Sequence, residues 1–195
     1  YSIPPRPRRP PCLETFTACW CQQCATWADV YDPWCEDHPD AVVIKYQIGS
    51  DPYATPEGEF RIDYYDLNAI PYTYCNGILV ANVDTNDLDT AYYPARMLHS
   101  DFIINSSFSV DDKVITVNNN IFPYVTTYGS RVQTVVMEKT TYGNVGGNGQ
   151  FQFHNVEMKM FPESGEGEVV NFCNDLPYSR TYTANLDSTN IEEFD

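Results

Sequence analysis

Apolar positions in the first half of the chain follow two spacings in turn. Short runs such as Ala41-Val42-Val43-Ile44 have the length and the β-branched character of buried strands. Between such runs, Trp27, Tyr31 and Trp34 recur at the spacing of one helix face. Asn76-Gly77 is the strongest short signal for a hairpin turn. The alternation predicts an α/β unit, with strands at 13–17, 41–48, 72–75 and 78–80 and helices at 22–38, 56–67 and 84–98.

After residue 100 the apolar positions change to a period of two, with turn residues between the segments. Within 151–161 the parity of the apolar positions changes near His154 and Asn155, which predicts a β-bulge there. The pattern is typical of a β sandwich. The chain therefore divides into an α/β domain at 12–99 and an all-β domain at 100–195. The predicted strands of the second domain lie around Ile103 and at 114–117, 131–138, 151–161, 168–172 and 178–183.

Residues 1–11 form a segment of distinct composition. They contain five prolines together with Arg6, Arg8 and Arg9, so they can form neither a helix nor a regular strand ladder. We predict an extended arm, which is ordered only where it docks on a surface. An acidic surface would attract its arginines. That surface belongs either to the arm's own domain or to a second copy of the chain, which would make the protein a homo-oligomer.

The charge of the chain excludes several partners. Among 195 residues, 11 Lys and Arg stand against 27 Asp and Glu, which gives a net charge of -16. A phosphate backbone or an anionic lipid surface would be repelled, so nucleic acid is excluded as a main partner. No run approaches the roughly 18 consecutive apolar residues of a membrane helix, so we predict no membrane insertion.

The cysteines indicate the compartment. The chain contains seven cysteines and a glycosylation sequon at Asn105-Ser106-Ser107. Both features are typical of exported proteins, in which disulfides persist. We therefore predict an extracytoplasmic location, in the periplasm, on the outer surface or in the medium. The number is odd, so complete pairing leaves one thiol free or bonded to another molecule. The seven cysteines are Cys12, Cys19, Cys21, Cys24, Cys35, Cys75 and Cys173.

Cys21 and Cys24 are the candidate catalytic residues. They lie between a predicted strand and a predicted helix, the context in which a C-x-x-C pair has redox meaning. The helix N terminus favours the thiolate of Cys21, the candidate nucleophile, and Cys24 then resolves the mixed disulfide. Because Gln22 and Gln23 are uncharged, we expect the Cys21 pKa to fall only to about 7. This chemistry needs no cofactor.

Two rival interpretations of local motifs are weaker. A structural zinc site needs a second C-x-x-C or a histidine pair, and His38, His99 and His154 are isolated, so we predict no metal. The segment from Gly143 to Gly149 has the glycine content of a phosphate loop. It lacks the lysine and joins two predicted strands, so it is interpreted as a flexible hairpin loop.

Three segments of the first half resemble the thioredoxin family. This resemblance implies a thioredoxin-like domain whose cis-proline, Pro71, faces Cys21. It also implies that Trp20, Ile70 and Pro71 bind the backbone of a substrate peptide. The segments are Phe16-Thr17-Ala18-Cys19-Trp20-Cys21-Gln22-Gln23-Cys24, similar to the active-site segment, Val43-Ile44-Lys45-Tyr46-Gln47-Ile48, similar to the central strand, and Ala69-Ile70-Pro71-Tyr72-Thr73-Tyr74-Cys75-Asn76-Gly77, similar to the cis-proline loop.

The chain departs from the thioredoxin pattern at two places. Where that family has a buried acid that moves protons, this chain has Thr15, with Glu14 on the other face of the strand. The proton shuttle is therefore in doubt. Cys19 lies two residues before Cys21 and competes for partners. The remaining disulfide candidates, either a redox relay or a set of staples, are Cys12, Cys19, Cys35, Cys75 and Cys173.

Segments of the second half resemble the bacterial outer-membrane-protein-twenty-eight-related family. Members of that family join a thioredoxin-like domain to an immunoglobulin-like β sandwich and are exported, often to the cell surface. They tend to continue into a further strand beyond the position of Asp195, so the sandwich would lack its last strand or leave an edge open for strand addition. The segments are Val135-Val136-Met137-Glu138-Lys139, Gly147-Asn148-Gly149-Gln150-Phe151 and His154-Asn155-Val156-Glu157-Met158-Lys159-Met160-Phe161-Pro162.

Two functions follow from these observations. The first is an exported thiol-disulfide oxidoreductase whose partners are protein thiols or disulfides, and the intact Trp-Cys-x-x-Cys with its proline loop favours it. The alternative is a structural or adhesive subunit of the cell surface or of a filament, in which the disulfides are staples. The arm at 1–11, the odd cysteine and Thr15 favour this alternative, with copies joined by the arm or by an open β edge.

Overall fold

The computed structural model describes residues 6–80, 84–143 and 146–192. In the first half it contains every predicted strand and helix, with ends shifted by a few residues, so the predicted α/β order is confirmed. The strands are β1 (Cys12–Thr17), β2 (Val42–Gln47), β3 (Tyr72–Cys75) and β4 (Ile78–Val80). The helices are α1 (Gln22–Asp37), α2 (Pro56–Tyr64) and α3 (Thr85–Arg96).

Local signals explain where these elements begin and turn. Thr55 caps α2 by accepting a hydrogen bond from the Gly58 N–H at 2.9 Å, and Asp84 caps α3 by accepting from the Asp87 N–H at 2.9 Å. Asn76 and Gly77 have φ values of 49° and 81°. Two consecutive positive φ angles suit the two-residue hairpin turn between β3 and β4, as the sequence predicted.

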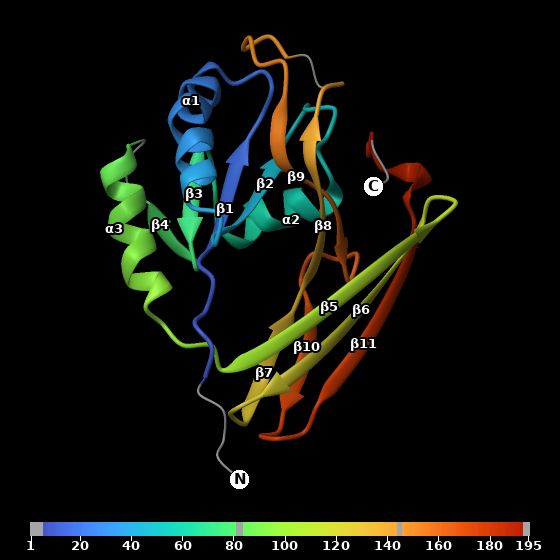
Figure 1. Ribbon diagram of the computed structural model, residues 1–195. Helices are drawn as coiled ribbons and strands as arrows, with labels where there is room; N and C mark the ends of the chain where they lie inside the picture. The colour runs from blue at the N-terminus through green and yellow to red at the C-terminus, as the bar shows by residue number, and fades with distance from the viewer. Residues whose placement is uncertain (1–5, 81–83, 144–145, 193–195) are drawn as a thin grey trace.

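A six-stranded mixed sheet, in the order β4-β3-β1-β2-β9-β8, lies with the three helices in the upper half of the molecule as drawn in Figure 1. Its last two strands, β8 (Thr134–Thr141) and β9 (Phe153–Phe161), come from the second half of the chain. β9 runs parallel to β2, with Lys45 paired to Val156, and β8 is antiparallel to β9. The hydrogen-bonded sheet therefore extends across the position of the predicted boundary at residue 100.

Helices cover both faces of this sheet. On one face α1 and α3 pack Trp27, Tyr31 and Tyr92 against Leu13 and other apolar residues of the strands. On the other face α2 and the residues after it cover a second cluster, in which Phe16 stacks on Tyr46 with ring centroids 5.1 Å apart. The aromatic residues at helix spacing are thus core residues of α1.

The second half also contains a three-stranded sheet and a two-stranded sheet. The three-stranded sheet has the order β11-β6-β5 and consists of β5 (Phe102–Asp111), β6 (Val114–Pro123) and β11 (Tyr178–Asn185). The two-stranded sheet pairs β7 (Thr127–Val132) with β10 (Glu168–Phe172). The architecture is a mixed α/β fold with additional antiparallel sheets.

Two sequence predictions for the second half need correction. The strand predicted at 131–138 is two strands, because at Gln133 the chain leaves the sheet of β7 and enters the sheet of β8. The predicted bulge near His154 and Asn155 lies elsewhere. The register of β8 and β9 shifts between Val136 and Met137, where Lys159 and Glu157 are the partners and Met158 is the additional residue. At Asn155 the backbone has a φ of 57°, but the strand register does not shift there.

The described part of the N-terminal arm docks on the chain's own body. Arg6 forms an ion pair with Asp101 at 2.7 Å, and the Arg8 guanidinium donates to the Met97 carbonyl at 2.6 Å. The Arg9 N–H donates to the Leu98 carbonyl at 2.9 Å. These arm residues thus contact residues 97–101 of their own chain; residues 1–5 lie outside the described part.

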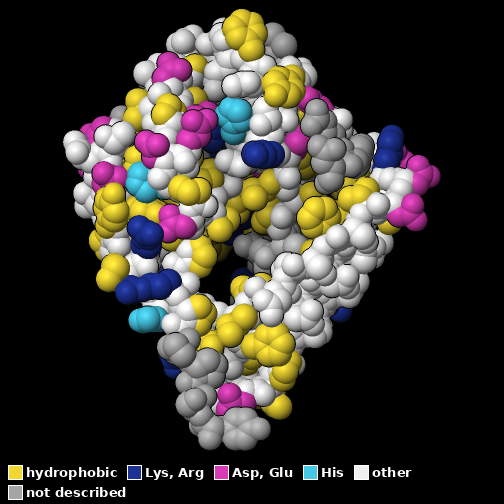
Figure 2. All heavy atoms as spheres, viewed as in Figure 1, with side chains coloured by type: hydrophobic (Ala, Val, Ile, Leu, Met, Phe, Trp, Pro, Cys, Tyr) yellow, Lys and Arg dark blue, Asp and Glu magenta, His cyan; other side chains and the backbone are white. Residues whose placement is uncertain are grey.

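The surface has a hollow between the six-stranded sheet and β5, visible near the centre of the space-filling view (Figure 2). A groove of about 460 Å³ between β5, β6 and β8 has mainly apolar side chains, including Phe108, Val117 and Val136. Among the described residues, none of the helices has the length and apolar character required to span a membrane.

Candidate functional site

Cys21 and Cys24 form a disulfide at the N terminus of α1, with Cα atoms 5.2 Å apart. The segment between β1 and α1 places them there, as the sequence predicted from the strand, the C-x-x-C motif and the helix in succession. Cys21 is 8% exposed and Cys24 is 1% exposed. Cys21 is therefore the more accessible of the two residues to an attacking thiolate.

Cys21 is also the capping residue of α1. Its Sγ accepts a hydrogen bond from the Cys24 N–H at 3.1 Å, and no acidic residue occupies the first turn of the helix. Unsatisfied N–H groups and the positive end of the helix dipole favour negative charge at this position. When the disulfide is reduced, the same features stabilise a thiolate on Cys21.

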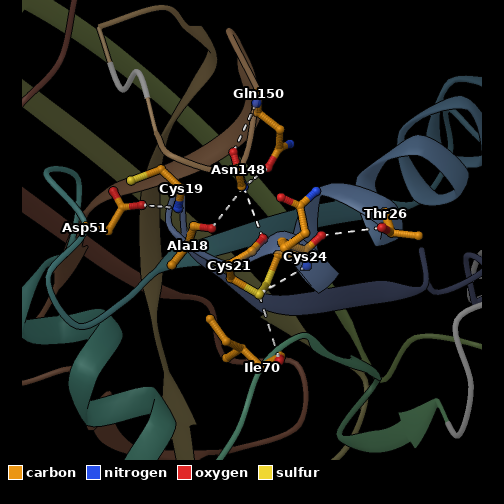
Figure 3. The surroundings of a disulfide bond; sticks show 10 residues. Ala18, Cys19, Cys21, Cys24, Thr26, Asp51, Ile70, Asn148 and Gln150 are labelled. Carbon is orange, nitrogen blue, oxygen red and sulfur yellow. Dashed lines mark hydrogen bonds between the residues drawn. A yellow bond between two sulfur atoms is a disulfide. The ribbon is translucent and has the colours of Figure 1, made fainter.

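The loop before β3 lies on the other side of the disulfide. The Ile70–Pro71 peptide bond is cis, as expected from the resemblance to thioredoxins. The Ile70 carbonyl oxygen lies 4.0 Å from Cys21 Sγ (Figure 3). An oxidised sulfur carries no proton, so only the reduced Cys21 thiol can donate to this oxygen.

A groove of about 700 Å³ opens beside the disulfide, between the Cys21 segment, α2 and the loop that ends at Ile70. Trp20 and Ile70, two of the three predicted substrate-binding residues, line it, and Pro71 follows Ile70 directly. Trp20 is 49% exposed, so its indole is available to a partner. The other apolar residues along the groove are Ile48, Ile62 and Leu67.

Two residues that the sequence did not single out hold the backbone around the disulfide (Figure 3). Asp51, just after β2, accepts a hydrogen bond from the Cys19 N–H at 2.7 Å. Asn148, in the loop between β8 and β9, donates from Nδ2 to the carbonyls of Ala18 at 3.3 Å and Cys21 at 3.2 Å. The described end of the predicted flexible loop is therefore held by the segment that contains Cys21. No local sequence pattern could predict these contacts, because Asp51 and Asn148 are distant in sequence from the segment that they contact.

The position where thioredoxins have a buried acid is occupied by a hydroxyl. Thr15 is buried, and its Oγ1 lies 3.0 Å from that of Thr73. Glu14 points to the other face, as predicted, and binds the Arg61 guanidinium at 2.7 Å. On the α1 face, the buried Lys45 forms an ion pair with Asp32.

The remaining five cysteines form no further disulfide in this structure, and each is free. Cys12 belongs to the core on the α2 face and Cys75 to the core on the opposite face, so the sheet separates them. Burial raises the pKa of Cys12, Cys19 and Cys35 to about 12, so these thiols are poor nucleophiles at neutral pH. Cys173 is exposed. Among the described residues, no group of three or more His, Cys, Asp or Glu is arranged to hold a metal ion.

Comparison with known proteins found a similar solved structure but no similar sequence. No family model and no curated protein sequence matches the chain. Among solved structures, HBP35 of Porphyromonas gingivalis is similar, with a TM-score of 0.72 and 14% sequence identity. The similarity covers 93% of this chain and 66% of the HBP35 chain, so this chain spans less than two thirds of that one. At this identity the likeness supports the mixed α/β arrangement alone.

Proposed function

We propose that this protein is an exported thiol-disulfide oxidoreductase that exchanges disulfides with other proteins through Cys21 and Cys24. In this proposal the first half is a thioredoxin-like domain and the second half an immunoglobulin-like sandwich. One observation above all supports it: the Cys21–Cys24 disulfide caps a helix, with its more exposed sulfur beside Ile70 and the adjoining groove. That is the placement in which a dithiol reacts with a polypeptide substrate.

The proposed reaction from the oxidised form has two steps. A substrate thiolate attacks Cys21 Sγ, forms a mixed disulfide and expels Cys24 as a thiolate, which takes a proton from solvent. A second substrate thiolate then attacks the substrate sulfur of the mixed disulfide and expels Cys21 as a thiolate. Two electrons pass to the Cys21–Cys24 pair. Of the two protons lost by the substrate thiols, Cys24 takes up one, and the other stays in solvent while Cys21 is a thiolate or binds Cys21 when it is protonated. Each step is reversible, so the reduced pair can reduce a substrate disulfide.

The proposed extracytoplasmic location fits the chemistry. A disulfide between Cys21 and Cys24 persists in an oxidising compartment, whereas cytosolic thiols are kept reduced. The sequon at Asn105 lies on β5, where the residue is exposed. Both observations are consistent with an exported protein.

The oxidoreductase proposal is tested by equilibrating the protein with glutathione buffers, alkylating it and quantifying the peptides that contain Cys21 and Cys24. We expect this pair alone to be reduced within about -270 to -120 mV, the range of known oxidoreductases. A pair that stays oxidised below about -300 mV, or a Cys21 bonded to another cysteine, would identify a structural staple.

Substitution of the two cysteines gives an independent test. Cys24→Ser should accumulate a mixed disulfide between Cys21 and a protein substrate, because the resolving thiol is absent. Cys21→Ser should abolish insulin reduction. Cys173→Ser changes an exposed free cysteine and is the matched control, with unchanged activity expected. Equal activity of all three variants would contradict the proposed roles.

The alternative, a structural subunit of the cell surface, is favoured by one observation. β5 is an edge strand of ten residues, and its Ile104 and Phe108 are 62% and 63% exposed. Long apolar edges invite pairing with another strand. If this function holds, the protein should self-associate at micromolar concentration, and Ile104→Lys should prevent it, as measured by analytical ultracentrifugation. A monomer at every concentration would exclude self-assembly through β5.

A further inference from the structure

We propose that Asn148 is a positioning residue for Cys21, holding the backbone of the active-site segment in the conformation that stabilises the Cys21 thiolate. This inference deepens the proposed function and rests on it. Asn148 comes from the loop between β8 and β9, more than a hundred residues from the C-x-x-C motif. The second half of the chain would thereby set the reactivity of the first.

The contacts of Asn148 surround the turn that contains Cys21. Its Nδ2 donates to the carbonyl oxygens of Ala18 at 3.3 Å and Cys21 at 3.2 Å, and its backbone N–H donates to the Cys19 carbonyl at 3.1 Å (Figure 3). The side chain is buried. Three carbonyls of one short segment are therefore held by a single residue.

Neighbouring residues fix the orientation of the Asn148 amide. Its Oδ1 accepts from the Gln150 N–H at 3.0 Å, so Nδ2 is the side that faces the carbonyls. Gln150 Oε1 lies 2.8 Å from Nδ2, and the two Nδ2 hydrogens are shared among this oxygen and the two carbonyls. Gly146 allows the loop to approach so closely. A Cβ at Gly146 would lie 2.0 Å from the Cys19 carbonyl oxygen, whereas a Cβ at Gly147 would meet nothing within 4 Å.

The electrostatic consequence concerns the Cys21 sulfur. The Cys21 carbonyl also accepts from the Ala25 N–H at 3.3 Å, so a donor on Asn148 fixes the first peptide plane of α1. With that plane fixed, the Cys24 N–H of the first turn remains directed at Cys21 Sγ.

Few other groups could supply this stabilisation. Among the described residues that line the groove beside the disulfide there is no Lys, Arg or His. Two acids lie near this segment, Asp51 at the Cys19 N–H and Glu59 in the groove, and acids oppose a thiolate. Oriented hydrogen-bond donors therefore decide how much thiolate forms.

The test measures the Cys21 pKa in the reduced full chain from the pH dependence of iodoacetamide alkylation, followed by mass spectrometry of the Cys21 peptide. For Asn148→Ala we expect the pKa to rise by about one unit, which lowers the thiolate fraction about tenfold at a pH well below the pKa. Gly146→Ala, which displaces the loop, should raise it in the same direction. Gly147→Ala is the matched control and should leave the pKa unchanged.

The isosteric variant Asn148→Asp covers the case in which the first two variants fail to fold. It keeps the Oδ1 acceptor for Gln150 and replaces the Nδ2 donor with a carboxylate oxygen, so the Cys21 pKa should rise further. A Cys21 pKa within about 0.3 unit of wild type in every folded variant of Asn148 and Gly146 would overturn the proposal, even if their melting temperatures fell. That result would leave Asn148 with a purely structural role.

The pKa measurement requires no turnover, so it separates this inference from the proposed function. If wild-type protein reduces no disulfide but Asn148→Ala still raises the Cys21 pKa, the oxidoreductase proposal fails and the positioning role of Asn148 stands. If wild-type protein is active and the variants share its Cys21 pKa, only the positioning role fails.

Discussion

Buried charged side chains in this protein find their partners on elements that are distant in sequence. Glu14 of β1 binds Arg61 of α2 and accepts a hydrogen bond from the Tyr65 hydroxyl at 2.6 Å. Lys45 of β2 pairs with Asp32 of α1. A buried charge is tolerated only with such partners. Their residue types are visible in the sequence, but which acid meets which base is not.

Glu157 is the buried acid with the least compensation. It lies on β9, accepts a hydrogen bond from the Thr55 hydroxyl, and its Oε1 has no hydrogen-bond partner among the described residues. Burial, with a smaller contribution from the neighbouring Glu57, raises the pKa of Glu157 to about 7, while the Thr55 hydrogen bond and Lys159 oppose the rise. The folded state therefore favours the protonated form.

This acid predicts how stability depends on pH. Because the folded pKa exceeds the unfolded value, the contribution of Glu157 is full below about pH 4.5 and is lost as the pH rises through about 7. Glu157→Gln should remove this loss and raise the free energy of unfolding at pH 8 by on the order of 2 kcal/mol. Urea unfolding at pH 4.5 and 8 measures it. Glu163→Gln, at an exposed acid, is the control. An identical pH dependence in Glu157→Gln and wild type would contradict the prediction.

At the scale of elements, local chemistry determined where each strand and helix begins. The hairpin between β3 and β4 shows this most directly, because Asn76 and Gly77 both adopt the positive φ angles that its two-residue turn requires. The separation of β7 from β8 at Gln133 could not be predicted from local sequence in this way. Residues 131–138 contain no glycine or proline that would mark a break, yet the chain changes sheets there.

The hairpin yields a stability prediction. Gly77 has a φ of 81°, and a Cβ there would meet no atom within 4 Å, so Gly77→Ala introduces backbone strain without a clash. We expect a loss of about 1 kcal/mol in the free energy of unfolding. Chemical denaturation measures it, with Gly147→Ala, also in open space but without a positive φ, as the control. Equal stability of both variants would show that this turn tolerates the strain.

At the scale of the whole molecule, the two halves of the chain share one sheet and parts of one core. β9 lies beside β2, and Met160 packs in the cluster that contains Phe16, Ile44 and Tyr46. Val156 and Phe153 pack against Cys19 and Tyr53 of the first half. The first half alone would leave these side chains and the edge of β2 uncovered.

The shared sheet predicts the behaviour of a fragment that ends at residue 99. Without β9 and β8 it loses a strand partner for β2 and the apolar cover of Tyr46. We expect no cooperative unfolding transition, together with binding of a hydrophobic dye, when near-UV circular dichroism and dye fluorescence are compared with the full chain. A fragment that unfolds cooperatively at a similar temperature would show that residues 12–99 are an independent domain.

The sequence alone determined most of the secondary structure and the position of the Cys21–Cys24 pair at the start of a helix. The periods of the apolar residues, the caps at Thr55 and Asp84 and the Asn76-Gly77 turn act over a few residues, and so does the C-x-x-C motif at the start of α1. Because these interactions involve residues close together in the sequence, they can be recognised without knowing the tertiary structure. They also placed Thr15 and Glu14 on opposite faces of β1.

Only the tertiary structure decided which distant segments meet. The insertion of β9 beside β2, the separation of Cys12 from Cys75 by the sheet and the docking of Asn148 on Ala18, Cys19 and Cys21 depend on chain topology. The same short-range patterns are compatible with several arrangements of these elements. The choice among them comes from burial of apolar surface over the whole molecule, a free energy that no local segment contains.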